Sequence, residues 1–327
     1  MLGNANRYYA TGELDEAIEV LTDVVRIDPG IRAPWFTLAT IWEEKGDREK
    51  SIMFKIVGTH LGGTRATASD WAVLGGESRD IGLLQQSIYC FTQAVKRDKN
   101  DVDSMWDRAV LLKLSGSTKQ AIKAFSAILQ IHPHDPGVLR ELTPLLASTN
   151  AHARAAALLL DAYNFTRAHF PIPTEDDVAS FGPSDLESLA DFLLQQRKFR
   201  ECVRVVKEGV RWMQGRAGEK GWDKLGDDRE FDDERKVREG WEGGTRYLEE
   251  AKVYELDVRL RARLGVARMA LKQVEEAQVG RRSRIEPSKS STDSQLNVMT
   301  LAPLHNRPPR VGLRVPRAVR RRRGRLP

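Results

Sequence analysis

One feature constrains this 327-residue chain more than any other: a small residue returns at an almost constant interval. The members of this column are Ala17, Ser51, Ser87, Ala121 and Ala155. The steps between them are 34, 36, 34 and 34 residues. A fixed period of this length is the sequence signature of a repeat architecture, in which each unit is one small supersecondary element stacked on its neighbours.

Further columns recur in register with the first. Twelve residues before it lies a second small residue, with a weaker match in the fifth unit: Ala5, Ala39, Gly75, Ala109 and Thr143. Four residues after it lies a large apolar residue in four of the units: Leu21, Phe91, Phe125 and Leu159. Turn and exit residues also recur, as Gly12, Gly46 and Gly116 five residues ahead of the column and as Pro29 and Pro133 behind it.

Each column has a physical reason. Two antiparallel helices approach closely only where both carry small side chains, and a large residue one turn later fills the groove beside that crossing. Glycine permits the left-handed backbone that ends the first helix, and proline cannot continue the second. A 34-residue unit of two such helices is the tetratricopeptide repeat (TPR). We therefore predict an all-α fold, a TPR superhelix with a disordered basic C-terminal tail, whose open curved surface suits holding other proteins.

The columns also predict how the chain is organised. The expected segments are a TPR array of five repeats (1–170), a linker (171–182), a sixth TPR (183–216), a charged insertion (217–252), a partial seventh TPR (253–280) and a disordered Arg/Pro-rich tail (281–327). In the sixth repeat Arg197 replaces the turn glycine, while Ala190 and Cys202 keep the spacing of twelve. Gly265 and Ala277 keep it in the seventh.

The tail differs in character from the rest of the chain. It carries twelve Arg and one Lys against two acidic residues, so the remainder of a chain with net charge +6 is mildly acidic. Proline and arginine without periodicity bury too little apolar surface to order a segment. The run Arg320–Arg323 is open to two interpretations, a nucleic-acid or nuclear-import signal and the product of a misread gene model. We hypothesise the second from about residue 280 onward, and mass-spectrometric detection of the peptide SSTDSQLNVMTLAPLHNR would contradict it.

Several classes of function find no support in the residues. Cys90 and Cys202 fall in packing columns and are expected to be buried thiols in a reducing compartment. His132 and His134 form the closest histidine pair, but no further ligands stand at zinc-site spacing. The chain has no phosphate-binding or dinucleotide-binding glycine motif and no apolar run of membrane-span length. We expect no enzyme activity, no metal and no cofactor.

Four stretches within the repeats narrow the function. They are QQSIYCFTQAVKRD (85–98), GVLRELTPLL (137–146), GVRWMQGR (209–216) and the acidic DDREFDDE (227–234). In this order they resemble the TPR-bearing subunit of transcription factor IIIC, the assembly that serves RNA polymerase III. The resemblance covers roughly residues 1–278. It departs from the family at both ends, because the acidic N-terminal extension and the later repeats are missing.

The resemblance implies a non-catalytic scaffold that works in the nucleus. In this family the N-terminal repeats take part in promoter recognition and in recruiting initiation factor IIIB through its Brf-type and Bdp-type subunits. Other transcription factor IIIC subunits dock on the repeats, and DNA is reached through the complex. The alternative from another class is a generic TPR adaptor or co-chaperone that binds peptide segments in the cytosol. An enzyme whose catalytic domain lies outside this chain is a third interpretation without support.

The inner wall of a TPR array is lined by first helices, which supply the candidate partner-binding residues. They are Asn6, Tyr9, Phe36, Thr40, Glu43, Arg79, Trp106 and Lys113. Aromatic side chains beside charges suit a peptide groove, although packing of Phe36 and Trp106 against a neighbouring repeat is the alternative. Leu2 stands where a co-chaperone carries a lysine of its carboxylate clamp, which argues against a chaperone-tail reader. The acidic run 227–234 is open between a solvated loop and a dock for a basic partner.

Overall fold

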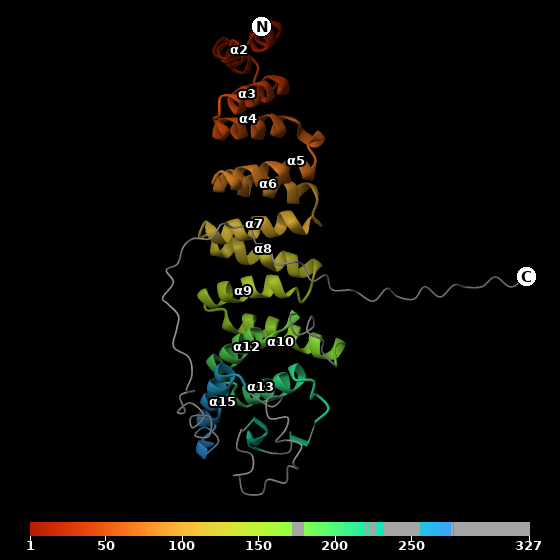
Figure 1. Ribbon diagram of the computed structural model, residues 1–327, viewed down its shortest axis with the longest axis vertical. Coiled ribbons are helices and arrows are strands. Elements are labelled where there is room, and N and C mark those ends of the chain that lie inside the picture. The colour runs from red at the N-terminus through yellow and green to blue at the C-terminus, as the bar shows by residue number, and fades with distance from the viewer. Residues whose placement is uncertain (172–179, 220, 223–225, 232–255, 276, 278–327) are drawn as a thin grey trace, which may run out of the picture. The chain divides into compact units, whose positions relative to one another are not determined.

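The computed structural model describes residues 1–171, 180–219, 221–222, 226–231, 256–275 and 277, and within these ranges the regular structure is helical (Figure 1). The chain forms two compact units, Met1–Ala151 and His152–Pro327. The first unit contains α1 (Leu2–Thr11), α2 (Leu14–Ile27), α3 (Arg32–Glu44), α4 (Arg48–Leu61), the 3-10 turn η1 (Gly63–Arg65), α5 (Ala68–Asp80), α6 (Leu84–Arg97), α7 (Val102–Leu114), α8 (Thr118–Ile131) and α9 (Pro136–Ser148). The second contains α10 (His152–His169), α12 (Pro183–Gln195), α13 (Phe199–Met213), the 3-10 turn η3 (Arg229–Phe231) and α15 (Val258–Ala270).

Within the first unit the helices pair and the pairs stack (Figure 1). Helix α1 packs on α2, α3 on α4, α5 on α6 and α7 on α8, and the second helix of each pair also contacts the first helix of the next. Within the second unit α12 contacts α10, α13 and α15, and α13 also contacts α15. This stacking of helix pairs is the predicted TPR arrangement, and the all-α fold class is confirmed.

The small residues make the helix crossings. Gly75 on α5 lies against α6, where a Cβ added to it would stand 2.9 Å from the Phe91 ring. The buried hydroxyl of Ser87 donates a hydrogen bond of 2.7 Å to the Gly75 carbonyl oxygen. The Cys202 thiol contacts the Ala190 carbonyl oxygen at 3.8 Å in the same way. Both columns therefore meet where the sequence places them, since only small side chains allow backbones this close.

The turn between the helices of each pair adopts a left-handed backbone. Gly12, Gly46, Gly82 and Gly116 have φ angles between 74° and 82°. Where the glycine is replaced, the conformation persists, with Asn150, Arg197 and Lys272 at φ 58°, 58° and 64°. The predicted left-handed backbone at the turn is confirmed. The packing of the two helices maintains this conformation even where a side chain makes it energetically costly.

Both cysteines are fully buried, and we expect neither to react in the folded protein. Burial raises the pKa of Cys90 and of Cys202 to about 12, because the thiolate form is excluded from water. Iodoacetamide at about pH 8 should leave both thiols unmodified in the native chain and alkylate both after unfolding, as measured by intact mass. Rapid labelling of the native chain would contradict the burial of that thiol.

Parts of the predicted organisation cannot be compared with the structure. Most of the linker, of the charged insertion and of the seventh repeat's second helix, and all of the basic tail, lie outside the described residues. The segment boundaries and the disorder of the tail stay predictions. Across the described portion of the chain, no helix combines the length and apolar character needed to cross a membrane.

Candidate functional site

Charged side chains connect successive first helices in the Met1–Ala151 unit. Arg79 on α5 lies 3.3 Å from Asp107 on α7, joined Nη1 to Oδ2. Lys113 on α7 lies 2.6 Å from Glu141 on α9, joined Nζ to Oε2. Each cation pairs with the acid 28 residues further along the chain. Arg79 and Lys113, two of the predicted groove residues, thus already form ion pairs that connect neighbouring repeats of the same chain.

Glu43 belongs to a third connection, which passes through a second helix. Lys55 on α4 lies 2.9 Å from Glu43 on α3 and 3.3 Å from Glu77 on α5. The hydrogen bond and charge of Lys55 hold the pKa of Glu43 below its ordinary value. Burial lowers the pKa of Lys55, but the two carboxylates outweigh that effect and raise it. Lys55 therefore stays charged and joins two repeats.

The candidates nearest the N-terminus differ in exposure. The Tyr9 hydroxyl donates a hydrogen bond of 2.6 Å to Glu44 on α3, which raises the pKa of Tyr9. Asn6 and Thr40 are exposed, and the Thr40 hydroxyl donates to the Phe36 carbonyl oxygen within its own helix. Asn6 and Thr40 therefore present open polar surface, whereas the Tyr9 hydroxyl is already held by the next repeat.

The two aromatic candidates are half-buried against helices of the array. The Trp106 ring meets Phe125 of α8 edge to face at 5.6 Å between centroids, and a Cβ added to Gly137 of α9 would lie 3.6 Å from it. The Phe36 ring lies against Gly58 of α4, where an added Cβ would come within 2.8 Å. Part of the surface of each ring is therefore buried by packing within the array. That the exposed part of each ring binds a partner stays a prediction.

Sequence reasoning missed the acidic partners on these helices. Glu44, Glu77, Asp107 and Glu141 were not singled out, although they complete the connections between repeats. A signal exists for two of them, since a cation followed by an acid 28 residues later recurs at Arg79 and Lys113. The candidate surface is thus a wall of first helices whose charges are largely matched within the chain.

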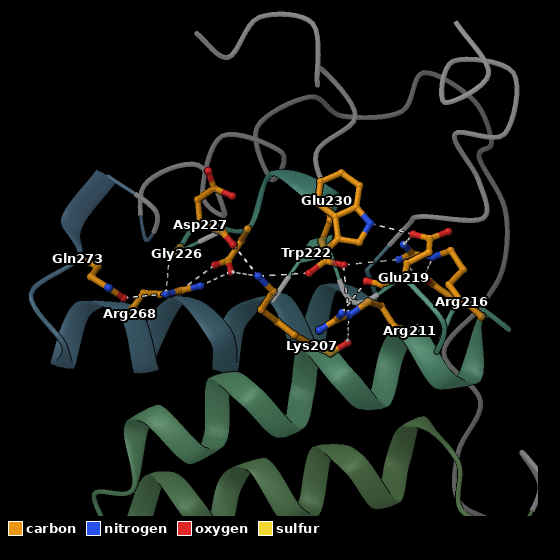
Figure 2. A network of polar contacts seen from close by, with 12 residues as sticks. Lys207, Arg211, Arg216, Glu219, Trp222, Gly226, Asp227, Glu230, Arg268 and Gln273 are labelled. Atoms are coloured by element: carbon orange, nitrogen blue, oxygen red, sulfur yellow. Dashed lines mark hydrogen bonds and ion pairs between the residues drawn. The ribbon is translucent and has the colours of Figure 1, made fainter. Parts of the chain in front are cut away.

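The second unit contains a buried polar network on α13 (Figure 2). Glu230 of η3 is 1% exposed and lies among three cations that are themselves buried. Its carboxylate stands 3.2 Å from the Lys207 ammonium, 3.5 Å from Arg211 and 3.9 Å from Arg216. Burial raises the pKa of Glu230 while the cations Lys207, Arg211 and Arg216 lower it, so desolvation exceeds the attraction.

A second carboxylate extends the network to α15. The Arg268 guanidinium donates to both carboxylate oxygens of Asp228, through Nε at 3.0 Å and through Nη2. Arg268 also donates to the Gly226 carbonyl oxygen at 2.9 Å, and the Lys207 ammonium donates to the Asp227 carbonyl oxygen at 2.6 Å. These contacts fasten residues 226–231 to both α13 and α15 (Figure 2).

This geometry corrects one interpretation of the acidic run. Asp228 is 8% exposed, Glu230 is 1% exposed, and Phe231 beside them is 1% exposed. In the described part of the run, residues 227–231, these carboxylates are not solvated and are already occupied by cations of the same chain. The sequence could not show this, because an acidic stretch without periodicity is ordinarily a surface loop.

The stacked helix pairs and small-residue crossings define a TPR protein. No family model matches the sequence. The chain is 27% identical over 288 residues to transcription factor tau subunit sfc4 of Schizosaccharomyces pombe, covering 85% of this chain and 28% of that protein. It is 33% identical over 131 residues to human general transcription factor 3C polypeptide 3, covering 40% of this chain and 15% of that protein. It is 23% identical to the transcription factor tau 131 kDa subunit of Saccharomyces cerevisiae, covering 85% of this chain and 31% of that protein.

These homologues are subunits of transcription factor IIIC, and the resemblance inferred from the sequence is confirmed. The chain spans less than a third of the length of each of these relatives. Among solved structures, the Naa15/Naa10 complex bound to HypK-THB aligns with 86% of this chain and 36% of that chain, at a TM-score of 0.50 and 11% identity. That likeness shows the fold alone.

Proposed function

We propose that this chain is a scaffold part of transcription factor IIIC and has no catalytic role. The observation that supports it is the combination of stacked TPR helix pairs with homology to transcription factor IIIC subunits over 85% of the chain. A stack of helix pairs offers an extended surface to other proteins. On this proposal the chain works in the nucleus, and its first partners are other subunits of the same factor.

The finer proposal concerns the partners and the surface that holds them. We propose that the repeats contribute to promoter recognition and to recruitment of initiation factor IIIB through its Brf-type and Bdp-type subunits, with DNA reached through the complex. The surface is the wall of first helices, including the candidates Asn6, Thr40 and the open faces of Phe36 and Trp106. A stable contact there would bury on the order of 1,600 Å² in total.

Affinity purification of the tagged chain, followed by mass spectrometry, tests this proposal. We expect the other transcription factor IIIC subunits to be recovered, with initiation factor IIIB subunits in smaller amount. Recovery of chaperones in their place would favour the cytosolic adaptor and overturn the proposal. Binding of a chaperone C-terminal peptide to the purified chain would also favour the cytosolic adaptor. We expect no such binding, because Leu2 stands where the carboxylate clamp has a lysine.

A further inference from the structure

A leucine column runs through the array and is broken in two repeats, the first and the fourth. The residue directly before the first-helix small residue is a leucine, at most 6% exposed, in five repeats: Leu38, Leu74, Leu142, Leu189 and Leu264. Asn4 holds this place in the first repeat and is exposed. In the fourth repeat the same place is held by Arg108, directly before the buried Ala109. A guanidinium therefore stands on α7 where the packing of five other repeats uses an apolar side chain.

The surroundings of Arg108 on α7 are those of a core position. The residues one turn away on either side, Ser104, Met105, Leu111 and Leu112, are all buried. Arg108 itself is half-buried, its Nε is buried without a hydrogen bond, and no ion pair joins it to any residue that the structure describes. Burial lowers the pKa of the Arg108 guanidinium, with no carboxylate acting against it.

Such an arrangement lowers the stability of the isolated chain. A charge partly removed from water without a partner costs free energy, whereas a leucine at this place would fill the same space without that cost. Departures from the packing rule of a repeat concentrate at functional positions, where a residue is kept for what it binds. Arg79 and Lys113, the other candidate cations on α5 and α7, have acidic partners, and Arg108 differs from them in this respect.

We infer that Arg108 is a partner-binding residue, and that its guanidinium takes the carboxylate of an Asp or Glu side chain from a bound protein segment. This inference rests on the proposed scaffold function. The planar fork of a guanidinium matches a carboxylate with two parallel hydrogen bonds, and it gains most where water is partly excluded. The carboxylate supplies on binding the counter-charge that no described residue of the free chain provides at this position.

The surrounding charge favours a protein carboxylate over a nucleic-acid phosphate. Nucleic-acid surfaces carry several Lys and Arg side chains on one face. Arg108 has acidic neighbours instead, because Asp103 and Asp107 lie on the same helix and Asp101 caps it. A polyanion would meet these three carboxylates, whereas one acidic side chain needs only the guanidinium.

The test compares three variants of the full chain, each first examined for thermal unfolding. R108L restores the leucine column, R108K keeps the charge without the fork, and R65L removes the same charge from the exposed end of η1. We expect R108L to raise the unfolding temperature by about 2–6 °C and R65L to leave it unchanged. An unchanged or lower unfolding temperature for R108L would overturn the argument that the guanidinium is an uncompensated cost.

The second readout is the recovery of transcription factor IIIC subunits with each tagged chain. We expect R108L to lose at least one subunit tenfold or more, R108K to lose the same subunit to a smaller degree, and R65L to match the wild type. If the wild type and R108L recover every subunit equally, the inference fails while the proposed function stands. If the wild type recovers none, the proposed function fails and the inference fails with it.

Discussion

Replacing Glu230 with alanine should lower the free energy of unfolding of the second unit by about 3–5 kcal/mol. The carboxylate is 1% exposed and lies within 4 Å of Lys207, Arg211 and Arg216, all of which are buried. Removing it leaves three cations out of water without their shared counter-charge. The expected loss does not contradict the raised pKa of Glu230. A buried ion pair can cost more than it contributes to stability, and removing one member still exposes the cost of the others.

The measurement is urea unfolding followed by circular dichroism, with hydrogen exchange to locate the loss on α13 and α15. Glu201→Ala is the matched control, because Glu201 lies on α13, the helix that carries Lys207 and Arg211, and meets Lys198 and Arg204 at 3.8 Å near the surface. We expect it to change stability by about 0.5 kcal/mol or less. A Glu230 variant as stable as this control would show that residues 226–231 are not fastened to the helices.

The helix pairs could be predicted from the sequence because their determinants are local. A small residue, a turn glycine and a large residue one turn later depend on spacing within one repeat, and every such column named from the sequence occupies the expected place. Even Arg197, which breaks the glycine pattern, keeps the left-handed turn at φ 58°. The period of the array therefore fixes the backbone where single residues depart from it.

The polar contacts could not be predicted, because each depends on two distant segments. The burial of Asp228 follows from Arg268, 40 residues further along the chain and on another helix. The occupied state of Arg79 follows from Asp107 in the next repeat. A list of charges does not reveal which of them meet, since the register between repeats decides that. Arg108 is the converse. Its position in a leucine column is visible in the sequence, whereas its lack of an acidic partner among the residues that the structure describes is not.

Replacing Ala121 with glutamate should lower the free energy of unfolding by roughly 2–4 kcal/mol. Ala121 on α8 is fully buried, as are Ala109, the small residue of its repeat on α7, and Phe125 one turn further along α8. A glutamate there adds a methylene group and a carboxylate to a crossing that has room for a methyl group. Helices α7 and α8 must separate to admit it, which displaces Trp106 and Lys113 without altering either side chain.

Gln120→Glu is the control for this change, because it adds the same charge to an exposed position one residue earlier on α8. We expect Gln120→Glu to unfold at the wild-type temperature and to recover the same partner subunits. We expect Ala121→Glu to unfold at a lower temperature and to lose partner subunits. The comparison separates the charge from the crossing. If Ala121→Glu kept wild-type melting and partner recovery, tight small-residue crossings would not be what positions the first helices, and the packing argument for the whole array would fail at its best-defined repeat.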